Sequence, residues 1–127
     1  MEALIYLDTH VLAWLYSGKT HLLSPRARIS IEQSPLRVSP MVVLELEFLK
    51  EIGRLTVGAS AIIESLRAHI GIEVCDLSFQ KIVASAREVT WTRDPFDRVI
   101  VGHAIAAGCA LLTKNRSIRR RFRETVW

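Results

Sequence analysis

The feature that most constrains this fold is a repeated alternation of short apolar runs with longer amphipathic stretches. Runs of four or five residues are typical of strands, whereas the stretches between them have the length and periodicity of helices. Strands that alternate with helices form βα units, which place a parallel sheet between helices on both faces. The sequence therefore predicts an α/β fold. The predicted strands are residues 3–7, 36–39, 72–75 and 110–113.

Caps and breaks mark where the helices begin and end. Ser24 before Pro25, and Asp94 before Pro95, each combine an N-cap residue with proline in the first turn. Gly108 follows the last periodic residue of another stretch, as a C-terminal glycine does. The predicted helices are residues 9–17, a helix starting at 24–25, and residues 40–52, 58–70, 78–89, 94–107 and 115–123.

Size and composition predict one domain over residues 1–127, because 127 residues is an ordinary domain length. No apolar run approaches the ~18 residues of a membrane-spanning helix, so we expect no membrane segment. The apolar run at the start has no basic residues before it, so we expect no signal peptide. Cys75 and Cys109 are isolated in sequence, and we expect two buried, reduced thiols in a cytoplasmic protein.

Parallel sheets place their functional sites beyond the carboxyl ends of the strands. Asp8 directly follows the first predicted strand, and Thr9, the next residue, is the predicted N-cap of the first helix. An acid there can be either a site residue or an alternative cap. Asp76 and the segment 113–115 follow two other strands, so their side chains are also candidates.

Glu45 is a charged residue on a face that should be apolar. It lies four residues after Met41 and three before Phe48, within a stripe that also includes Leu44, Leu49 and Ile52. An unpaired buried charge would cost several kcal/mol. Glu45 therefore needs a cation, a set of donors or a water-filled cleft, and the alternative to a functional role is a buried salt bridge with an arginine.

Asp97 repeats this pattern, since Ile100, Val101 and Ala104 follow it on the same helical face. An acid in the first turn is also favoured by the helix dipole, so both interpretations remain open for Asp97. Asp94 is best explained as the N-cap.

Three carboxylates, Asp8, Glu45 and Asp97, could converge at one end of the sheet. Like charges repel unless a cation neutralises them, and oxygen ligands favour Mg²⁺ or Mn²⁺. Such ions promote hydrolysis of phosphodiesters. Residues 114–127 carry six basic side chains and one acidic one, while the whole chain has a net charge of +4, and this basic end could hold a nucleic-acid backbone. The candidate RNA-binding residues are Arg98, Arg116, Arg119, Arg120 and Arg121.

Four segments resemble the PIN-domain family, and within it the VapC-like toxins of bacterial toxin–antitoxin pairs. The third segment is the most specific and places the family's third acid on Asp97. Segment 24–28 (SPRAR) is also similar. The four segments are 7–14 (LDTHVLAW), 45–55 (ELEFLKEIGRL), 93–101 (RDPFDRVIV) and 111–116 (LLTKNR).

The resemblance implies a three-layer α/β/α PIN-like fold with a central, mainly parallel sheet of four to five short strands. It implies an endoribonuclease that uses Mg²⁺ or Mn²⁺, a cognate antitoxin as partner and a homodimer. Asp8, Glu45 and Asp97 would be the catalytic and metal-binding residues, and Thr9, Asp94, Thr113 and Asn115 would be secondary candidates. Asn115 stands where the family often has a fourth acid; an asparagine keeps an oxygen ligand but loses the charge.

Two other functions fit parts of the sequence. A PIN fold with Asn115 could bind RNA or protein without cutting. A phosphoacceptor receiver domain could use Asp76, Thr113 and Lys114, but Asp8 lacks the second acid that a receiver has beside it. A phosphatase of the haloacid-dehalogenase type fails for the same reason.

Overall fold

A five-stranded parallel sheet in the order β3-β2-β1-β4-β5 forms the centre of the molecule. This arrangement comes from a computed structural model, which describes residues 3–127; Met1 and Glu2, which the predicted domain 1–127 includes, lie outside the described residues. The strands are β1 (Ile5–Leu7), β2 (Leu36–Val38), β3 (Glu73–Val74), β4 (Ala110–Leu112) and β5 (Thr125–Val126).

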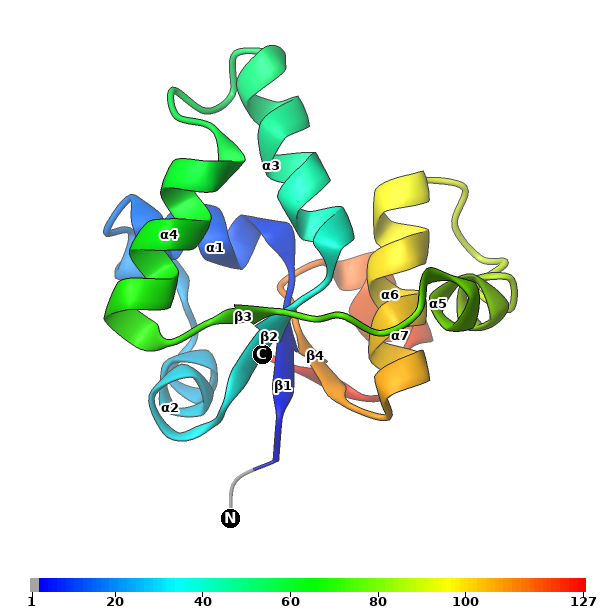
Figure 1. Cartoon of the computed structure of the whole chain (residues 1–127). Helices are drawn as coiled ribbons and strands as arrows, with labels where there is room; N and C mark the ends of the chain where they lie inside the picture. Colours follow the sequence, from blue (N-terminus) through cyan, green and yellow to red (C-terminus); the bar gives the residue numbers. More distant parts are fainter. Residues whose placement is uncertain (1–2) are drawn as a thin grey trace.

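Helices cover both sides of the sheet (Figure 1). The helices α1, α2 and α4 lie on one side, α5, α6 and α7 lie on the other, and α3 rises between them. The predicted three-layer α/β/α fold with four to five parallel strands is confirmed. The helices are α1 (Thr9–Tyr16), a short 3-10 helix η1 (Thr20–Leu22), α2 (Pro25–Gln33), α3 (Pro40–Glu51), α4 (Ala59–Ile70), α5 (Phe79–Ala86), α6 (Pro95–Ala107) and α7 (Arg116–Arg121).

Local caps explain most helix boundaries. The Ser24 hydroxyl accepts the Ala27 N–H, and Asp94 accepts from the first turn of α6, as predicted. Gly71 and Gly108 end α4 and α6 in the left-handed conformation, with φ of 70° and 66°, where a side chain would be strained.

The first helix begins differently from the prediction. Asp8, rather than Thr9, is the N-cap of α1, because its backbone is extended and its carboxylate accepts the Thr9 N–H. The strands are also shorter than predicted, because Ser39 leaves β2 to cap α3 and Thr113 lies just beyond β4. The elements β5 and η1, of two and three residues, were not predicted because they are too short for a periodic pattern.

The core lies between the sheet and its helices. Leu7, Leu111 and Leu112 of the two central strands are fully buried, and they pack with buried residues of α1, α3, α4 and α6. The predicted thiols, Cys75 and Cys109, are free but only half-buried. No helix within residues 3–127 is long and apolar enough to cross a membrane.

Candidate active site

Asp8 is at the centre of the candidate site because it leaves the middle strand at its carboxyl end. Leu7 pairs with Leu112, so the next residues of the two strands, Asp8 and Thr113, emerge side by side. Asp8 is 3% exposed, and its two oxygens accept hydrogen bonds from the Thr9 N–H at 2.8 Å and the Thr113 hydroxyl at 2.6 Å. His10 Nδ1 lies 3.7 Å from the same carboxylate. Neutral donors therefore stabilise a buried acid.

Glu45 reaches this site from α3. Its Oε1 accepts a hydrogen bond of 2.5 Å from the hydroxyl of Thr9, which is itself buried. Burial raises the pKa of the Glu45 carboxyl; the Thr9 hydrogen bond lowers it, and the charges of Asp8 and Asp94 raise it further. Within residues 3–127 no basic side chain forms a salt bridge with Glu45, so the alternative of a buried arginine partner is not supported.

The buried face of α3 differs from the predicted one. Val42 and Leu46 are the fully buried residues of this helix, and Glu45 is half-buried beside them. In the predicted apolar stripe, Leu44, Phe48 and Ile52 are 57%, 40% and 51% exposed. The stripe was wrong because the face of α3 with the most apolar residues is only partly covered: Phe48 contacts the Phe96 ring of α6, while Leu44 and Ile52 stay exposed.

Asp97 lies in the first turn of α6 and faces the same acids. Burial, followed by the negative charges of Asp8, Asp94 and Glu45, raises the pKa of Asp97 to about 7. Asp94 Oδ1 accepts the N–H groups of Phe96 at 2.9 Å and Asp97 at 3.3 Å, which confirms that Asp94 caps the helix. Its charge nevertheless adds to the negative potential at the site.

Asn115 joins the end of β4 to Asp97. Its amide nitrogen donates to Asp97 Oδ2 at 3.4 Å, and its backbone N–H donates to the Thr113 hydroxyl at 3.0 Å. Its side-chain oxygen accepts the Ile118 N–H at 3.2 Å and so caps α7. We expected Asn115 to offer an oxygen ligand, but that oxygen is used by the cap and the N–H₂ group faces the acids instead.

These groups can attract a hard cation. The charge of Asp8 raises the pKa of the Glu45 and Asp97 carboxyl groups, and the charge of Glu45 also raises that of Asp97. A cation would remove this repulsion. In the described part of the chain, no three acid, histidine or cysteine side chains are close enough together to enclose a metal on their own. Mg²⁺ needs no such cage, because it binds through one or two carboxylates and keeps several waters. The donor set therefore fits an Mg²⁺ or Mn²⁺ ion that retains part of its water shell.

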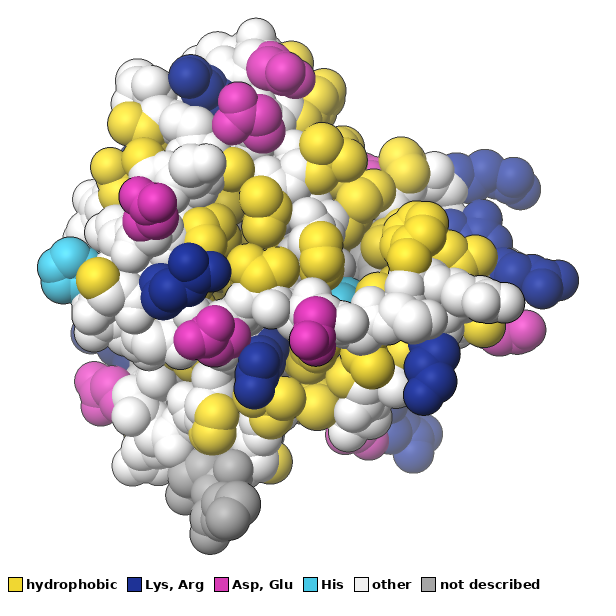
Figure 2. Space-filling model, in the orientation of Figure 1, with side chains coloured by type: hydrophobic (Ala, Val, Ile, Leu, Met, Phe, Trp, Pro, Cys, Tyr) yellow, Lys and Arg dark blue, Asp and Glu magenta, His cyan; other side chains and the backbone are white. Residues whose placement is uncertain are grey.

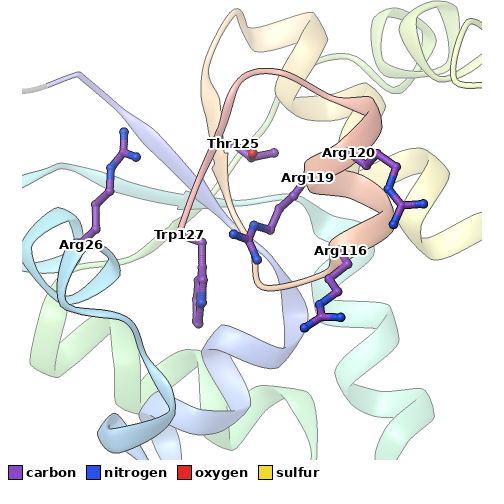
Figure 3. A pocket seen from close by; sticks show the side chains of 6 residues that line it. All are labelled: Arg26, Arg116, Arg119, Arg120, Thr125 and Trp127. Carbon is purple, nitrogen blue, oxygen red and sulfur yellow. The ribbon is translucent and has the colours of Figure 1, made fainter.

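The predicted RNA-binding arginines separate into two groups. The Arg98 guanidinium donates to the carbonyl oxygens of Ala86 at 3.0 Å and Arg87 at 3.2 Å, so it ties α6 to the end of α5. Arg121 is exposed and lies outside the pocket that its neighbours form. That pocket is lined by Arg26, Arg116, Arg119, Arg120, Thr125 and Trp127 (Figure 3).

Arg26 and Trp127 are not among the candidate RNA-binding residues that the sequence predicts. Arg26 lies in the first turn of α2, about ninety residues before α7, and no local pattern connects the two. Asp76, the phosphoacceptor of the receiver alternative, is exposed after the edge strand β3. The acids described above come from the central strand and from α3 and α6, so the site does not resemble a receiver.

Known proteins with a similar fold include three solved structures. The fold is similar to a chain in the structure of VapBC2 from Rickettsia felis bound to a DNA fragment from their promoter, at 16% identity and a TM-score of 0.70, covering 98% of this chain and 99% of that one. It is also similar to VapBC from Salmonella typhimurium bound to DNA, at 21% identity and a TM-score of 0.61, covering 98% and 96%. A third similar structure is VapBC-1 from nontypeable Haemophilus influenzae, at 14% identity and a TM-score of 0.58, covering 96% and 94%.

No curated protein matches the sequence. The family model of the PIN domain matches residues 5–123, which includes all four segments of the resemblance and nearly every element of the fold. This chain therefore belongs to the PIN-domain family.

Proposed function

We propose that this chain is a metal-dependent endoribonuclease, the VapC-like toxin of a toxin–antitoxin pair, which hydrolyses RNA phosphodiester bonds with Mg²⁺ or Mn²⁺. PIN domains are generally nucleases, and the similar solved structures are VapBC complexes. One observation carries the proposal for this chain itself. Asp8, Glu45 and Asp97 approach from three elements, and within residues 3–127 no lysine or arginine forms a salt bridge with any of them.

Asp8, Glu45 and Asp97 would hold the metal. When bound, a divalent cation supplies an activated water and stabilises the negative charge that develops on a phosphodiester. Thr113 and Thr9 orient Asp8 and Glu45 through their hydroxyls, so these carboxylates keep their direction without a basic partner. Glu45 Oε1 is held by Thr9, which leaves Oε2 to bind the metal or accept a proton from the attacking water. The raised pKa of Glu45 suits that second role.

A second function is that of a catalytically weak or inactive PIN module that binds RNA or protein. The observation that favours it is the amide of Asn115, which donates to Asp97 and adds no charge. The two functions differ in whether RNA is cleaved when metal is present, and the variants below separate them.

The toxin proposal includes a cognate antitoxin and action in the cytoplasm, where the RNA substrate is. It also includes a homodimer, for which the chain has a suitable surface. Leu44 of α3 and Phe79 of α5, 57% and 70% exposed, line one apolar pocket that contains no charged residue. Figure 2 shows apolar side chains gathered over α3 and α5. A two-fold contact would place this surface against its own copy, which has the same chemistry.

The homodimer predicts that light scattering gives twice the chain mass of 14.4 kDa. Leu44→Asp should produce the monomer, because a charge would be buried at the contact. Ile29→Asp is the matched control, since Ile29 is 53% exposed on α2, and it should leave the dimer intact. A monomeric parent protein at micromolar concentration would contradict the homodimer.

Replacing Glu45 tests the nuclease directly. Glu45→Gln keeps the size of the side chain but removes its charge, so cleavage of RNA in Mn²⁺ should fall by about 100-fold or more. The melting temperature should stay the same or rise, because repulsion with Asp8 is relieved. Glu51→Gln, at an exposed position of the same helix, should cleave normally. Unchanged cleavage by Glu45→Gln would remove Glu45 from the site, and no cleavage by the parent protein would favour the inactive module.

The raised pKa of Asp97 predicts a pH-dependent stability. Because this pKa is about 7 in the folded chain and near 4 in the unfolded one, the Asp97 charge destabilises the fold as the pH rises from 4 to 7. In chelator, Asp97→Asn should therefore raise the free energy of unfolding by about 1–2 kcal/mol at pH 8, because water screens part of the repulsion, and change it little at pH 4. Denaturant unfolding measures both values.

Two comparisons sharpen this test. Asp76→Asn, at an exposed position, should have no pH-dependent effect. At pH 8, saturating Mn²⁺ should cancel the gain in the free energy of unfolding that Asp97→Asn gives in chelator. The reason is that the ion stabilises a folded protein that binds it, which is the parent and not the variant. If Asp97→Asn raises the free energy of unfolding equally at pH 4 and pH 8, the negative charges of the other acids do not act on Asp97.

Asn115→Asp should restore a fourth carboxylate without losing the cap, since aspartate also accepts the N–H groups of a helix start. Its charge beside Asp97 should tighten Mn²⁺ binding by about 10-fold and lower the melting temperature in chelator at pH 8. Asn115→Ser is the matched control, because it can cap but carries no charge. If the two variants have the same Kd for Mn²⁺ by titration calorimetry and the same melting temperature in chelator, Asn115 lies outside the metal site.

A further inference from the structure

The arginine pocket is a concentration of positive charge without acidic partners. It is an open hollow of about 490 Å³ whose lining contains four arginines and no acidic side chain. Within residues 3–127, none of these four guanidinium groups forms a salt bridge. Figure 3 shows Arg119 reaching from α7 toward Trp127, with Arg26 of α2 on the far side of that ring. Four cationic side chains around one hollow, with no acidic side chain in its lining, favour an anionic ligand.

A second hollow continues from this pocket toward the acids. It measures about 380 Å³ and is lined by His10, Trp14, Lys114, Asn115 and Arg116, so that Arg116 belongs to both hollows. Asn115 donates to Asp97, and His10 lies beside Asp8, so two residues of the second hollow contact acids of the candidate active site. The two hollows share Arg116, and we name their combined lining the track.

Aromatic rings line the track between its cationic groups. The centroids of Trp14 and Trp127 are 6.1 Å apart, and His10 lies 4.9 Å from Trp14 and 6.4 Å from Trp127. The Lys114 ammonium lies 5.7 Å from the centre of the Trp14 ring. Lys114 is further placed by its backbone N–H, which donates to His10 Nε2 at 3.0 Å. The cations are thus interleaved with flat rings rather than grouped alone.

We propose that the track binds single-stranded RNA, with phosphates on Arg26, Arg116 and Arg119 and a base against Trp127, and that it leads the strand to Asp8 and Asp97. This inference rests on the proposed function, and it assigns roles to Arg26 and Trp127. Interleaved cations and aromatic faces fit single-stranded nucleic acid, because phosphates pair with the cations while unstacked bases lie on the rings. An acidic peptide could pair with the arginines but would have no bases to stack on the rings, and the acids at the end of the track would repel it.

The first experiment measures binding of a fluorescent single-stranded oligoadenylate RNA in chelator, so that cleavage plays no part. Arg116→Ala/Arg119→Ala should raise Kd by about 10-fold or more at low salt and reduce the log–log salt slope by about 1.4, which is 0.7 for each lost phosphate contact. Lys50→Ala/Arg54→Ala removes the same charge from the last turn of α3 and the bend that follows it, and it should leave the slope unchanged. Equal slopes for the two double variants would overturn the proposal.

The second experiment tests the base contact. Trp127→Leu should weaken oligoadenylate binding by about 5-fold or more but should not weaken binding of an abasic strand of the same length. Trp127→Phe should retain most of the affinity, which guards against a simple loss of folding. Equal loss for both strands, with Trp127→Phe no better than Trp127→Leu, would contradict the role of the ring.

Two outcomes separate this inference from the proposed function. If the parent protein binds oligoglutamate but not RNA, the track serves an acidic protein partner and the inference is wrong. Because binding is measured without metal, a Kd that depends on Arg116 and Arg119 supports the track even if no RNA is cleaved. If the parent protein cleaves RNA but the track variants bind RNA as tightly as the parent, the nuclease proposal stands and the track proposal is wrong.

Discussion

The rest of the site depends on the hydrogen bonds that the buried carboxylate of Asp8 accepts. Burying a charge costs several kcal/mol unless hydrogen bonds replace the lost water. Here the Thr9 N–H and the Thr113 hydroxyl donate hydrogen bonds in place of that water. Both donors reach Asp8 only because β1 pairs with β4 in one register and α1 starts directly after β1. Because Asp8 alone connects β1 to α1, the adjacent Thr9 also lies at the site, where its hydroxyl donates to Glu45 of α3. One acid therefore links two strands and two helices.

The site keeps charges that a fold selected only for stability would avoid. Asp97 and Glu45 are half-buried near Asp8, and their raised pKa values show that their charged forms are disfavoured. Perturbed carboxyl groups of this kind gather at functional sites. Immediately beside them, the track carries arginines and Lys114. In the function that we propose, a metal-bound phosphodiester would have charges that suit both parts, since the ion would bind the acids and the flanking phosphates would bind the cations.

The similar structures share 14–21% of their residues with this chain and still have its fold. Such divergence is possible because a parallel α/β fold needs a pattern of apolar strands and capped helices rather than particular side chains. Function, in contrast, depends on the site. The acids at the strand ends, the amide of Asn115 and the track therefore say more about this protein than its fold does.

The sequence alone determined the features that act over a few residues. Ser24, Asp94 and Gly108 marked helix ends because caps and positive-φ glycines are local, and the apolar runs located four of the five strands. Asp8 and Asp97 could be singled out for the same reason, since each follows a local signal that leads to the carboxyl end of the sheet.

The tertiary structure decided what depends on distant partners. It selected Val42 and Leu46 as the buried face of α3, because packing against other helices, and not the count of apolar residues, determines which face is covered. It joined Thr9 to Glu45, turned the Asn115 oxygen to a cap, and brought Arg26 beside α7. These contacts join residues from separate elements, or use a side chain that has several possible partners. No periodicity or propensity encodes such a choice, because it depends on how the whole chain packs.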